Sequence, residues 1–582
     1  MTIPTPPLSP NFIGPDDFRC AAPRAFDQDQ TIAVDQLETS TLNGSPTLAF
    51  GLSSGELLMI KPRELRADAG LTRVLEQATL IGHELKSPLR HLLDTAGIRP
   101  HVIMDTSIAD LLLRGVKQDG PSPGLVALGL KHLGQKWPNA TDPDPRNRLA
   151  ARLRLLHPLY STLQAATDAA GLHDVLELEL QALPVIAAME STGVGIDVEL
   201  LERAVRSRNL EIDELAARIS EMLGIGSLGR SRLFREALES RLGCTVGGID
   251  HEHLDRFRRN KVVATLLRWL DLTSSNPGDQ LHHALLRSSD GRVRPSWNQV
   301  SGPTGRLTTR WPNLQSLPRA HGFRAAVIPA PGMSFVVADY STIELRIAAA
   351  LHGEHRLADA FRGGLDPHRV TAALLVGAPA EDITAEQRQL AKAVNFGLLY
   401  GMGPRSLADH VGRRVGVGMS EARARSFIER YFKSYRRLSR ARDTARRRAR
   451  LQNGHLEARS ASGRLHRLPT AAGPGRAAMI AANARALMSS PIQGTCSDGL
   501  KSAMVLLDPQ LRTLGARMVL CVHDEIVVEC PMDACEECRR IVELAVRRHG
   551  AMGTSRPNRR NQQGMQELVR LRRDAVHQAD AV

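Results

Sequence analysis

The chain has 582 residues, a formal net charge of +14 at pH 7, and 42% hydrophobic against 24% charged side chains. This composition is typical of a globular protein and excludes an intrinsically disordered chain, while the length predicts several domains rather than one core. The positive charge favours a polyanionic partner, because each phosphate neutralised by Lys or Arg releases counterions. An arginine-rich composition without such a partner is the alternative.

Residues 1–22 are rich in proline and polar side chains and predict a flexible leader. They lack the basic start and apolar run of a secretory signal, and no apolar stretch is long enough to cross a bilayer. We therefore expect no membrane partner and a cytoplasmic location, associated with the nucleoid if the source is bacterial. The seven scattered cysteines suit a reducing compartment. Cys535 and Cys538 form a single CxxC, which could bind zinc but which we interpret as two ordinary thiols on a helix surface.

Residues 23–175 predict an α/β domain, because the short apolar runs TIAV, TLAFGL and ELLMI alternate with amphipathic helical stretches. From residue 176 to about residue 290 the apolar spacing is almost wholly helical. Residues 296–319 are rich in loop-forming residues, and a second α/β region follows them.

The segment FVVADYSTIELR begins as an apolar strand and continues as a helix. Asp339 is therefore expected at a strand end, with Glu344 on the helix that follows. The simpler interpretation of Asp339 is a helix N-cap.

The segment RMVLCVHDEIVVEC predicts two strands that meet at His523, Asp524 and Glu525. A hairpin tip presents such adjacent carboxylates to solvent or to a metal ion. An ordinary turn would also favour Asp at this place.

The segment RQLAKAVNFGLLYGMG predicts a helix that glycines end. Arg388 and Lys392 are four residues apart, so they share a face and together could bind a polyphosphate. Phe396 and Tyr400 continue the same spacing and offer flat surfaces on which a base can stack. A solvated basic face and two core aromatics are the alternatives.

Together these segments predict a phosphoryl-transfer site, with carboxylates from separate strands for divalent metals and a cationic helix for phosphates. DYSTIELR, RQLAKAVNFGLLYG and VHDE closely resemble the three polymerase motifs of family A DNA polymerases, the type of bacterial DNA polymerase I. The flanking segments TGRLTTRWPNLQSLP, LDPHRVTAALL, SASGRLHRLP and SSPIQGTCSD resemble the family as well, in the same order.

The resemblance implies a DNA-directed DNA polymerase, a nucleotidyltransferase of replication or repair that binds primer–template DNA and deoxynucleoside triphosphates as a monomer. Two Mg²⁺ ions would be held by Asp339 and Asp524, with Glu525 beside the second ion and Lys392 placed to protonate the leaving pyrophosphate. Nucleotide-binding residues would be Arg388, Lys392, Phe396, Tyr400, His368 and Glu344, the last excluding a ribose 2′-hydroxyl. DNA-binding residues would be Arg306, Arg485, Gln493 and His523.

The implied fold class is multidomain α/β, with an RNase H-like exonuclease-type domain before a right-hand polymerase fold. The expected divisions are a leader (1–22), a degenerate 3′–5′ exonuclease-like domain (23–175), a thumb (176–290), a first palm part (291–350), fingers (351–465), a second palm part (466–550) and an atypical tail (551–582). Two residues depart from the family near the site: Thr342 replaces the usual Gln, and Ser489 the usual Asn.

The exonuclease motifs of the family are matched poorly. Asp35 and Glu38 are one residue too far apart for the first motif, and Pro88 replaces the Asp of the second. The third motif lacks its Tyr and Asp, although Asp105 is a possible substitute. We therefore expect a retained scaffold without proofreading activity.

Two further segments have unusual compositions. Between Lys433 and Arg450 nine basic residues stand against the single acidic Asp443, which predicts either a DNA backbone contact or a solvated helix. Residues 551–582 are polar and then helical in pattern, where the family has a final palm strand. We therefore expect the palm sheet to lack its closing strand, with a short helix over residues 566–576.

Two other functions fit parts of the pattern. A single-subunit RNA polymerase shares the palm chemistry, but Glu344 and the NFGLLYG helix are typical of the deoxyribose-selective site. A DNA-binding protein without catalysis would explain the degenerate exonuclease motifs, but it would not need Asp339, Lys392 and Asp524.

Overall fold

The computed structural model describes residues 11–18, 20, 31–37, 47–52, 56–115, 123–134, 144–228, 232–274, 276–340, 342–416, 418–451, 456–549 and 576–579. Glu38 lies outside these ranges. The helix expected over residues 566–576 also lies outside them, except for its last residue, Val576. None of the helices in the described ranges is long and apolar enough to cross a membrane.

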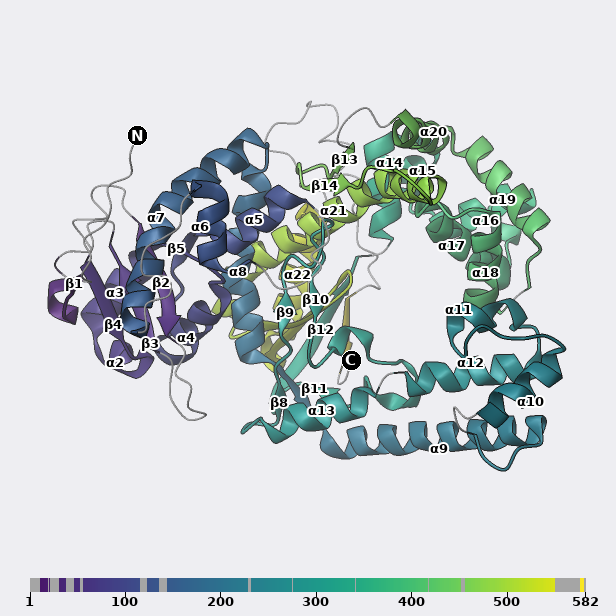
Figure 1. The fold of residues 1–582 in the computed structure, drawn as a ribbon, viewed down its shortest axis with the longest axis horizontal. Coiled ribbons are helices and arrows are strands. Elements are labelled where there is room, and N and C mark those ends of the chain that lie inside the picture. Colours follow the sequence, from purple (N-terminus) through teal and green to yellow (C-terminus); the bar gives the residue numbers. More distant parts are fainter. Residues whose placement is uncertain are drawn as a thin grey trace.

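The N-terminal domain is built on a six-stranded sheet, flanked by helices at the left of Figure 1. The strand order is β1-β4-β3-β2-β5-β6, in which β2 is antiparallel to β3 and parallel to β5. The strands are β1 (Asn11–Phe12), β2 (Ile32–Leu37), β3 (Thr47–Gly51), β4 (Glu56–Ile60), β5 (Thr79–Gly82) and β6 (His101–Asp105). The helices are α2 (Pro62–Ala67), α3 (Ala69–Gln77), α4 (Lys86–Ala96), α5 (Thr106–Arg114), α6 (Leu125–Leu133) and α7 (Pro145–Ala169).

The prediction of a flexible leader is wrong for the part of residues 1–22 that the structure describes. Strand β1 pairs with β4, and the Phe18 side chain is fully buried with its ring centroid 6.4 Å from that of Phe50. Burying a phenylalanine ring contributes about 1.5–3 kcal/mol, which helps to offset the entropy of ordering a short polar segment.

Helix α8 (His173–Thr192) joins the N-terminal domain to the rest of the chain. Leu180 and Leu183 belong to the N-terminal core, whereas Ile186 and Met189 belong to the core of the central sheet. The two apolar faces of one helix therefore fix the domains against each other.

The predicted thumb is a long helical arm along the lower edge of Figure 1. A separate core at its tip includes Phe234, Leu238 and Leu266. The elements are β7 (Val194–Ile196), α9 (Val198–Leu223), α10 (Arg232–Leu242), α11 (His251–Leu254), η1 (Asp255–Phe257), α12 (Lys261–Thr273) and α13 (Pro277–Leu286). Short strands β8 (Arg292–Val293), β9 (Trp297–Asn298), β10 (Thr308–Thr309) and β11 (Val327–Ile328) follow.

The central sheet has the order β15-β16-β12-β17, and all its neighbouring strands are antiparallel. It consists of β12 (Met333–Asp339), β15 (Arg517–Val522), β16 (Glu525–Pro531) and β17 (Val576–Ala579). The expectation that this sheet lacks its closing strand is wrong, because β17 pairs with Phe335–Ala338 of β12. An open edge of β12 would leave backbone groups unpaired, so even a short segment without strand periodicity is stabilised there.

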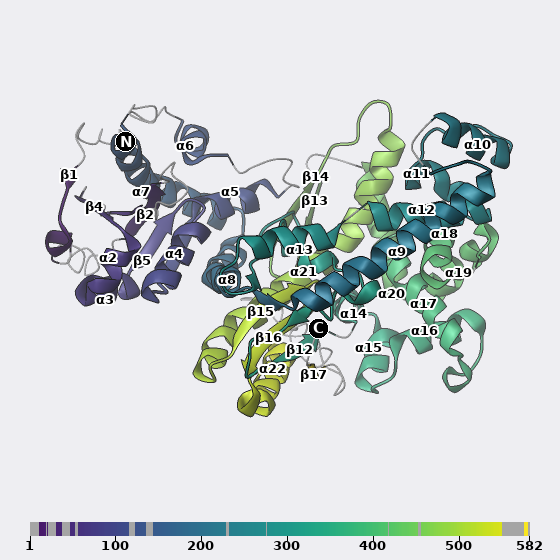
Figure 2. The same ribbon diagram turned by 90° about the horizontal axis from the view of Figure 1, so that it is seen from below.

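The helices that follow β12 form the upper right of Figure 1, and Figure 2 shows them at the opposite end from the N-terminal domain, with the central sheet between. They are α14 (Ile343–His352), α15 (His355–Arg362), α16 (Pro367–Val376), α17 (Ala385–Leu399), α18 (Pro404–Val415), α19 (Glu421–Ser434) and α20 (Arg436–Leu451). A hairpin of β13 (Leu456–Arg459) and β14 (Leu465–Leu468) leads to α21 (Arg476–Thr513), and α22 (Cys535–His549) covers the sheet.

A buried charge cluster holds α21 against α8. Glu179 accepts hydrogen bonds from Lys501 Nζ at 2.5 Å and Gln299 Nε2 at 2.7 Å, and it also pairs with Arg464. Although burial opposes the ionised carboxyl, Lys501 and Arg464 lower the pKa of Glu179. This cluster fixes the long helix that carries Arg485 and Gln493.

Candidate active site

A cavity of about 730 Å³ opens where the end of β12, the β15–β16 hairpin, α17 and α21 meet. It brings together many of the residues that the sequence predicts for the site: Arg306, Asp339, Glu344, Lys392, Phe396, Tyr400, His523 and Asp524. The remaining predicted residues lie outside its lining: Glu525, Arg388, His368, Arg485 and Gln493.

The carboxylates are placed by strand pairing. Asp339 ends β12 opposite Glu525, which begins β16, and the Tyr340 backbone N–H donates to the Asp524 carbonyl at 3.2 Å. His523 and Asp524 form the hairpin turn, with His523 in the left-handed region at φ 59°. A two-residue turn that begins with a residue of positive φ matches the twist of its strands, and this tight turn holds Asp524 next to Asp339.

Burial and the neighbouring carboxylates shift the acidity of this group. Burial, with the charge of Asp339, raises the pKa of Asp524 to about 7 and also raises the pKa of Glu525. Burial raises the pKa of Asp339 as well, although the charges of Lys392 and Arg319 oppose this shift. Carboxylates that face each other in this way favour a bound divalent cation, which stabilises their ionised forms.

The carboxylates at the cavity fit Mg²⁺ better than they fit a metal ion that takes all its ligands from the protein. No group of three or more His, Cys, Asp or Glu side chains within the described ranges is arranged to hold a metal. Mg²⁺ is commonly bound by one or two carboxylates, with phosphate oxygens and water completing the coordination. Asp339 and Asp524 provide that pair.

Glu344 is held at the cavity wall by two neighbours. The Tyr400 hydroxyl donates to Glu344 Oε2 at 2.5 Å, and Arg306 forms an ion pair with the same carboxylate. Burial and the charge of Glu344 raise the pKa of Tyr400, so its hydroxyl stays protonated and donates. The Glu344 side chain is thereby fixed in one position.

Helix α17 begins at a capping box formed by Thr384 and Gln387 and carries Lys392, Phe396 and Tyr400 into the cavity. Arg388, one turn before Lys392, instead pairs with Asp366 at 2.5 Å. The spacing predicts that Arg388 and Lys392 share a face of α17. The carboxylate of Asp366 nevertheless holds Arg388 away from the cavity lining.

His368 lies beside this pair in a buried position. Its Nδ1 is 3.0 Å from Asn395 Nδ2, and its ring centroid is 5.9 Å from that of Phe396. It therefore contacts the helix behind Phe396 rather than the cavity.

The end of α17 approaches α21 closely. Gly401 has φ 73°, and a Cβ atom there would lie 2.9 Å from Cγ of Arg485. Both the backbone angle and the space favour glycine. Arg485 is exposed on α21, and Gln493 lies half-buried on the same helix.

The sequence analysis missed Arg319, which lines the cavity. Its charge opposes the rise in pKa of Asp339 and Glu525, and Arg324 also acts on Glu525. Both arginines belong to an irregular segment between β10 and β12, where no periodicity shows which way a side chain faces. Their only signal is basic charge shortly before the strand that ends at Asp339.

Two carboxylates suspected in the N-terminal domain, Asp35 and Asp105, are already bound by protein donors. Arg152 donates to Asp35 at 2.6 and 3.2 Å. Asp105 caps α5 through the Ser107 N–H at 2.9 Å and accepts from the Leu85 N–H at 2.8 Å. Pro88 is buried in α4.

The cysteines form a separate apolar cluster. Cys530 Sγ lies 3.3 Å from Cys535 Sγ, and both residues are buried together with Cys538. Burial is one cause that raises the pKa of Cys535, to about 11, so this thiol is un-ionised at neutral pH. The prediction that Cys535 and Cys538 lie on a helix surface is wrong, because both are buried.

Comparisons with known proteins agree with this geometry. Residues 199–556 match the model of DNA polymerase family A. Aquifex aeolicus DNA polymerase I is 29% identical over 82% of this chain and 86% of its own length. The thermostable DNA polymerase I of Thermus filiformis is 32% identical over 79% of this chain and 56% of its own length. The DNA polymerase I of Pseudomonas aeruginosa is 34% identical over 66% of this chain and 43% of its own length. The chain thus spans about half the length of the last two relatives.

A solved structure shares the fold. It is the POL domain of Pol1 from M. smegmatis in complex with DNA primer-template and dNTP, with a TM-score of 0.76 and 24% identity over 92% of this chain and 95% of that chain. The fold and the paired carboxylates define a nucleotidyltransferase with a polymerase fold. Since the family model covers more than half of the chain, the protein belongs to DNA polymerase family A, a family of DNA-directed DNA polymerases.

Proposed function

We propose that this protein adds deoxynucleotides to the 3′-hydroxyl of a primer under the direction of a DNA template, with two Mg²⁺ ions and release of pyrophosphate. The observation that carries the proposal is the pair Asp339 and Asp524 at the cavity, with raised pKa values, facing the helix of Lys392. The names of the relatives, DNA polymerase I, support it.

The carboxylates would hold the metals, with Glu525 beside them. Bound Mg²⁺ would favour ionisation of the primer hydroxyl and stabilise charge on the triphosphate. Lys392 would bind the phosphates and protonate the leaving pyrophosphate. Arg388 would add a second phosphate contact once it leaves Asp366, and His368 would support that face of α17.

Sugar and base selection would lie with Phe396, Tyr400 and Glu344. A Glu344 side chain fixed by Tyr400 and Arg306 cannot easily move aside for a ribose 2′-hydroxyl. Steric exclusion of this kind discriminates against the wrong sugar without added attraction for the right one.

Primer–template DNA would contact the residues around the cavity mouth. These include the predicted DNA-binding residues Arg306, Arg485, Gln493 and His523. The solved structure of similar fold is a complex with DNA primer-template and dNTP, which supports such a binding mode. We propose a monomeric enzyme of replication or repair in the cytoplasm.

The N-terminal domain would be an RNase H-like scaffold without proofreading activity. The order β4-β3-β2-β5-β6, with an antiparallel pair on one side of β2 and parallel strands on the other, supports this. The engagement of Asp35 by Arg152 and of Asp105 by backbone N–H groups leaves these side chains poorly suited to bind two metals.

A primer-extension assay with deoxynucleotides or ribonucleotides tests the proposal. We expect Mg²⁺-dependent extension with deoxynucleotides and strong rejection of ribonucleotides. Preferred use of ribonucleotides would indicate an RNA polymerase, and binding to DNA without any extension would indicate a non-catalytic protein. Glu344→Ala should raise ribonucleotide use relative to deoxynucleotide use, while Tyr400→Phe, which removes only the hydroxyl, should have the smaller effect.

A further inference from the structure

Helix α20 presents a rigid basic surface away from the cavity. Its inner face is formed by Leu438, Ala445 and Ala449, which are buried. Ala445 and Ala449 share a core with the β13–β14 hairpin and with Leu487 of α21. These contacts fix the orientation of the opposite face.

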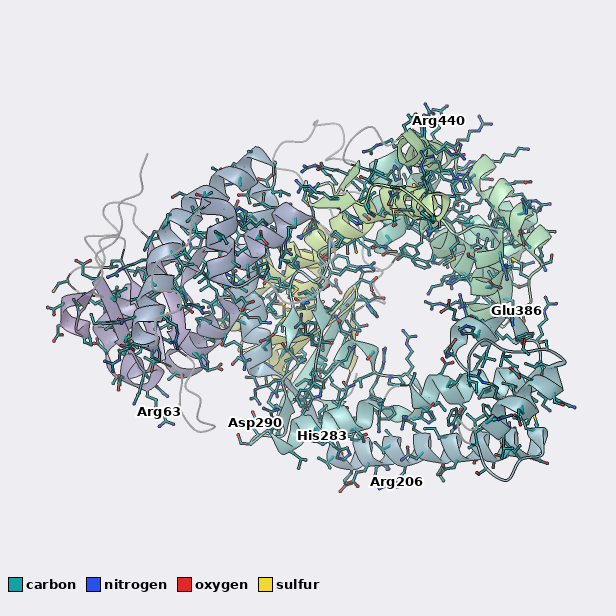
Figure 3. All side chains as sticks on the ribbon, in the orientation of Figure 1. Arg63, Arg206, His283, Asp290, Glu386 and Arg440 are labelled. Atoms are coloured by element: carbon teal, nitrogen blue, oxygen red, sulfur yellow. The ribbon has the colours of Figure 1, made fainter. Side chains whose placement is uncertain are left out.

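That opposite face carries a line of arginines. Arg436, Arg440 and Arg447 fall within a narrow sector of the helix, turned away from Leu438, and all three are exposed. Figure 3 shows Arg440 at the outer margin of the molecule, on the side of α20 away from the central sheet. The line is about 16 Å long at ~1.5 Å per residue. A DNA strand carries about five phosphates over such a length.

The charges on this line are not neutralised by the protein. None of Arg436, Arg440 and Arg447 has an ion-pair partner within the described ranges. The single acid of α20, Asp443, pairs with Arg442 at 3.4 Å, and Arg442 also stacks on Phe432. Arginines four residues apart, such as Arg436 and Arg440, repel each other and destabilise the helix.

Helix α22 provides an internal comparison, since it too is rich in arginine. Arg539 pairs with Glu536 and with Glu543 at 2.5 Å, and Arg540 pairs with Glu537 at 2.6 Å. An arginine-rich composition alone therefore does not produce an uncompensated face, because Arg539 and Arg540 of α22 pair with acids of the same helix.

We propose that the line of Arg436, Arg440 and Arg447 is a second DNA-binding surface, which holds the backbone of the single-stranded template beyond the cavity. The inference rests on the proposed polymerase function. Helix α20 packs on the segment of α21 that also carries Arg485, so it is the element next to the expected template contact. Guanidinium groups bind phosphates through paired hydrogen bonds. Contacts to phosphates carry no sequence information, so binding is independent of sequence.

The test compares DNA affinity as a function of overhang length. The variant Arg440→Gln/Arg447→Gln keeps two good helix-forming residues and removes two charges. The control Arg539→Gln/Arg540→Gln removes the same charge from α22. Dissociation constants are measured by fluorescence anisotropy on primer–templates with a 5′ overhang of about 15 nucleotides or with a single unpaired nucleotide, over a range of salt.

We expect the α20 variant to bind the long overhang roughly tenfold more weakly, with a log–log salt slope reduced by about 1.4 for two lost contacts to a single strand. Affinity for the short overhang and single-turnover extension at saturating DNA stay unchanged. An equal loss on both overhangs, an equal loss in the α22 control, or no loss at all would overturn the proposal. Binding is read without catalysis, so a wild-type protein that fails to extend primers refutes the polymerase function separately.

Discussion

The N-terminal domain and the central sheet both place carboxylates at strand ends, yet the two regions treat them in opposite ways. Asp35 is bound by Arg152 and Asp105 by backbone N–H groups, whereas Asp339 and Asp524 both line the same cavity. Burial raises the pKa of Asp524 to about 7, with Asp339 adding to the shift.

Asp110 of the N-terminal domain shows that burial alone does not decide the outcome. Burial would raise its pKa, but hydrogen bonds from Lys131 and His132 lower it. A buried carboxylate with protein donors is stabilised in its ionised form and has little need of a metal. Carboxylates that face each other cost folding free energy, and such perturbed groups concentrate at functional sites. The comparison therefore supports the proposal of metal chemistry at the central sheet and of a scaffold role for the N-terminal domain.

The largest effect is expected from Asp524→Asn. This change removes the charge of a proposed metal ligand and should lower the single-turnover extension rate on the order of 10³-fold or more, with little change in DNA affinity. The matched change in the other region, Asp35→Asn, should leave extension within about twofold. Near-normal extension by Asp524→Asn, or a large loss with Asp35→Asn, would reverse the assignment.

The second effect concerns Glu179, a buried carboxylate that is bound by basic side chains. Lys501→Met leaves Glu179 with an uncompensated share of its charge and should reduce the free energy of unfolding by about 3–5 kcal/mol in chemical denaturation. The double variant Glu179→Gln/Lys501→Met should recover part of the loss. A double variant less stable than the single one would show that Lys501 does not act through Glu179.

The third effect is a loss of stability as pH rises, caused by the raised pKa of Asp524. The carboxyl of Asp524 has a pKa of about 7 when folded and ~3.9 when unfolded, so the unfolded chain loses this proton first as pH rises. The contribution of Asp524 to stability therefore falls between about pH 4 and pH 7 and is constant above. In metal-free buffer at pH 8, Asp524→Asn should be more stable than wild type, on the order of 2–4 kcal/mol.

The difference between wild type and Asp524→Asn isolates this group, because carboxylates with lowered pKa values contribute equally to both proteins. If Asp524→Asn were as stable as wild type both at pH 5 and at pH 8, the raised pKa of Asp524 would be contradicted.

The smallest effect is expected where α17 meets α21. Gly401→Ala places a Cβ atom against Arg485 at a positive φ, so the helix end should shift and the extension rate should fall about tenfold. Gly416→Ala is the matched control, because Gly416 has φ 72° with nothing near its Cβ position. A loss of rate in both variants would show that backbone strain matters, rather than the contact with Arg485.

The local patterns of the sequence predicted several of the elements that line the cavity. A strand end located Asp339, a hairpin tip located Asp524, and helical spacing placed Lys392, Phe396 and Tyr400 on one face. These features depend on residues close together in the chain, so periodicity is enough to find them.

Long-range partners could not be predicted in the same way. The pairing of Asp35 with Arg152 spans 117 residues, and β17 is stabilised by the open edge of β12 rather than by its own sequence. The burial of Phe18 likewise depends on the sheet that it covers. Arg319 was missed because an irregular segment carries no period from which its direction could be inferred.

The most direct test of the account is the binding of Mn²⁺, a paramagnetic substitute for Mg²⁺, followed by electron paramagnetic resonance in wild type, Asp524→Asn and Asp35→Asn. The account predicts that Asp35→Asn binds Mn²⁺ as wild type does, and that Asp524→Asn loses about tenfold or more in affinity. Undiminished binding by Asp524→Asn, together with a loss in Asp35→Asn, would place the metal site in the N-terminal domain and contradict the central claim.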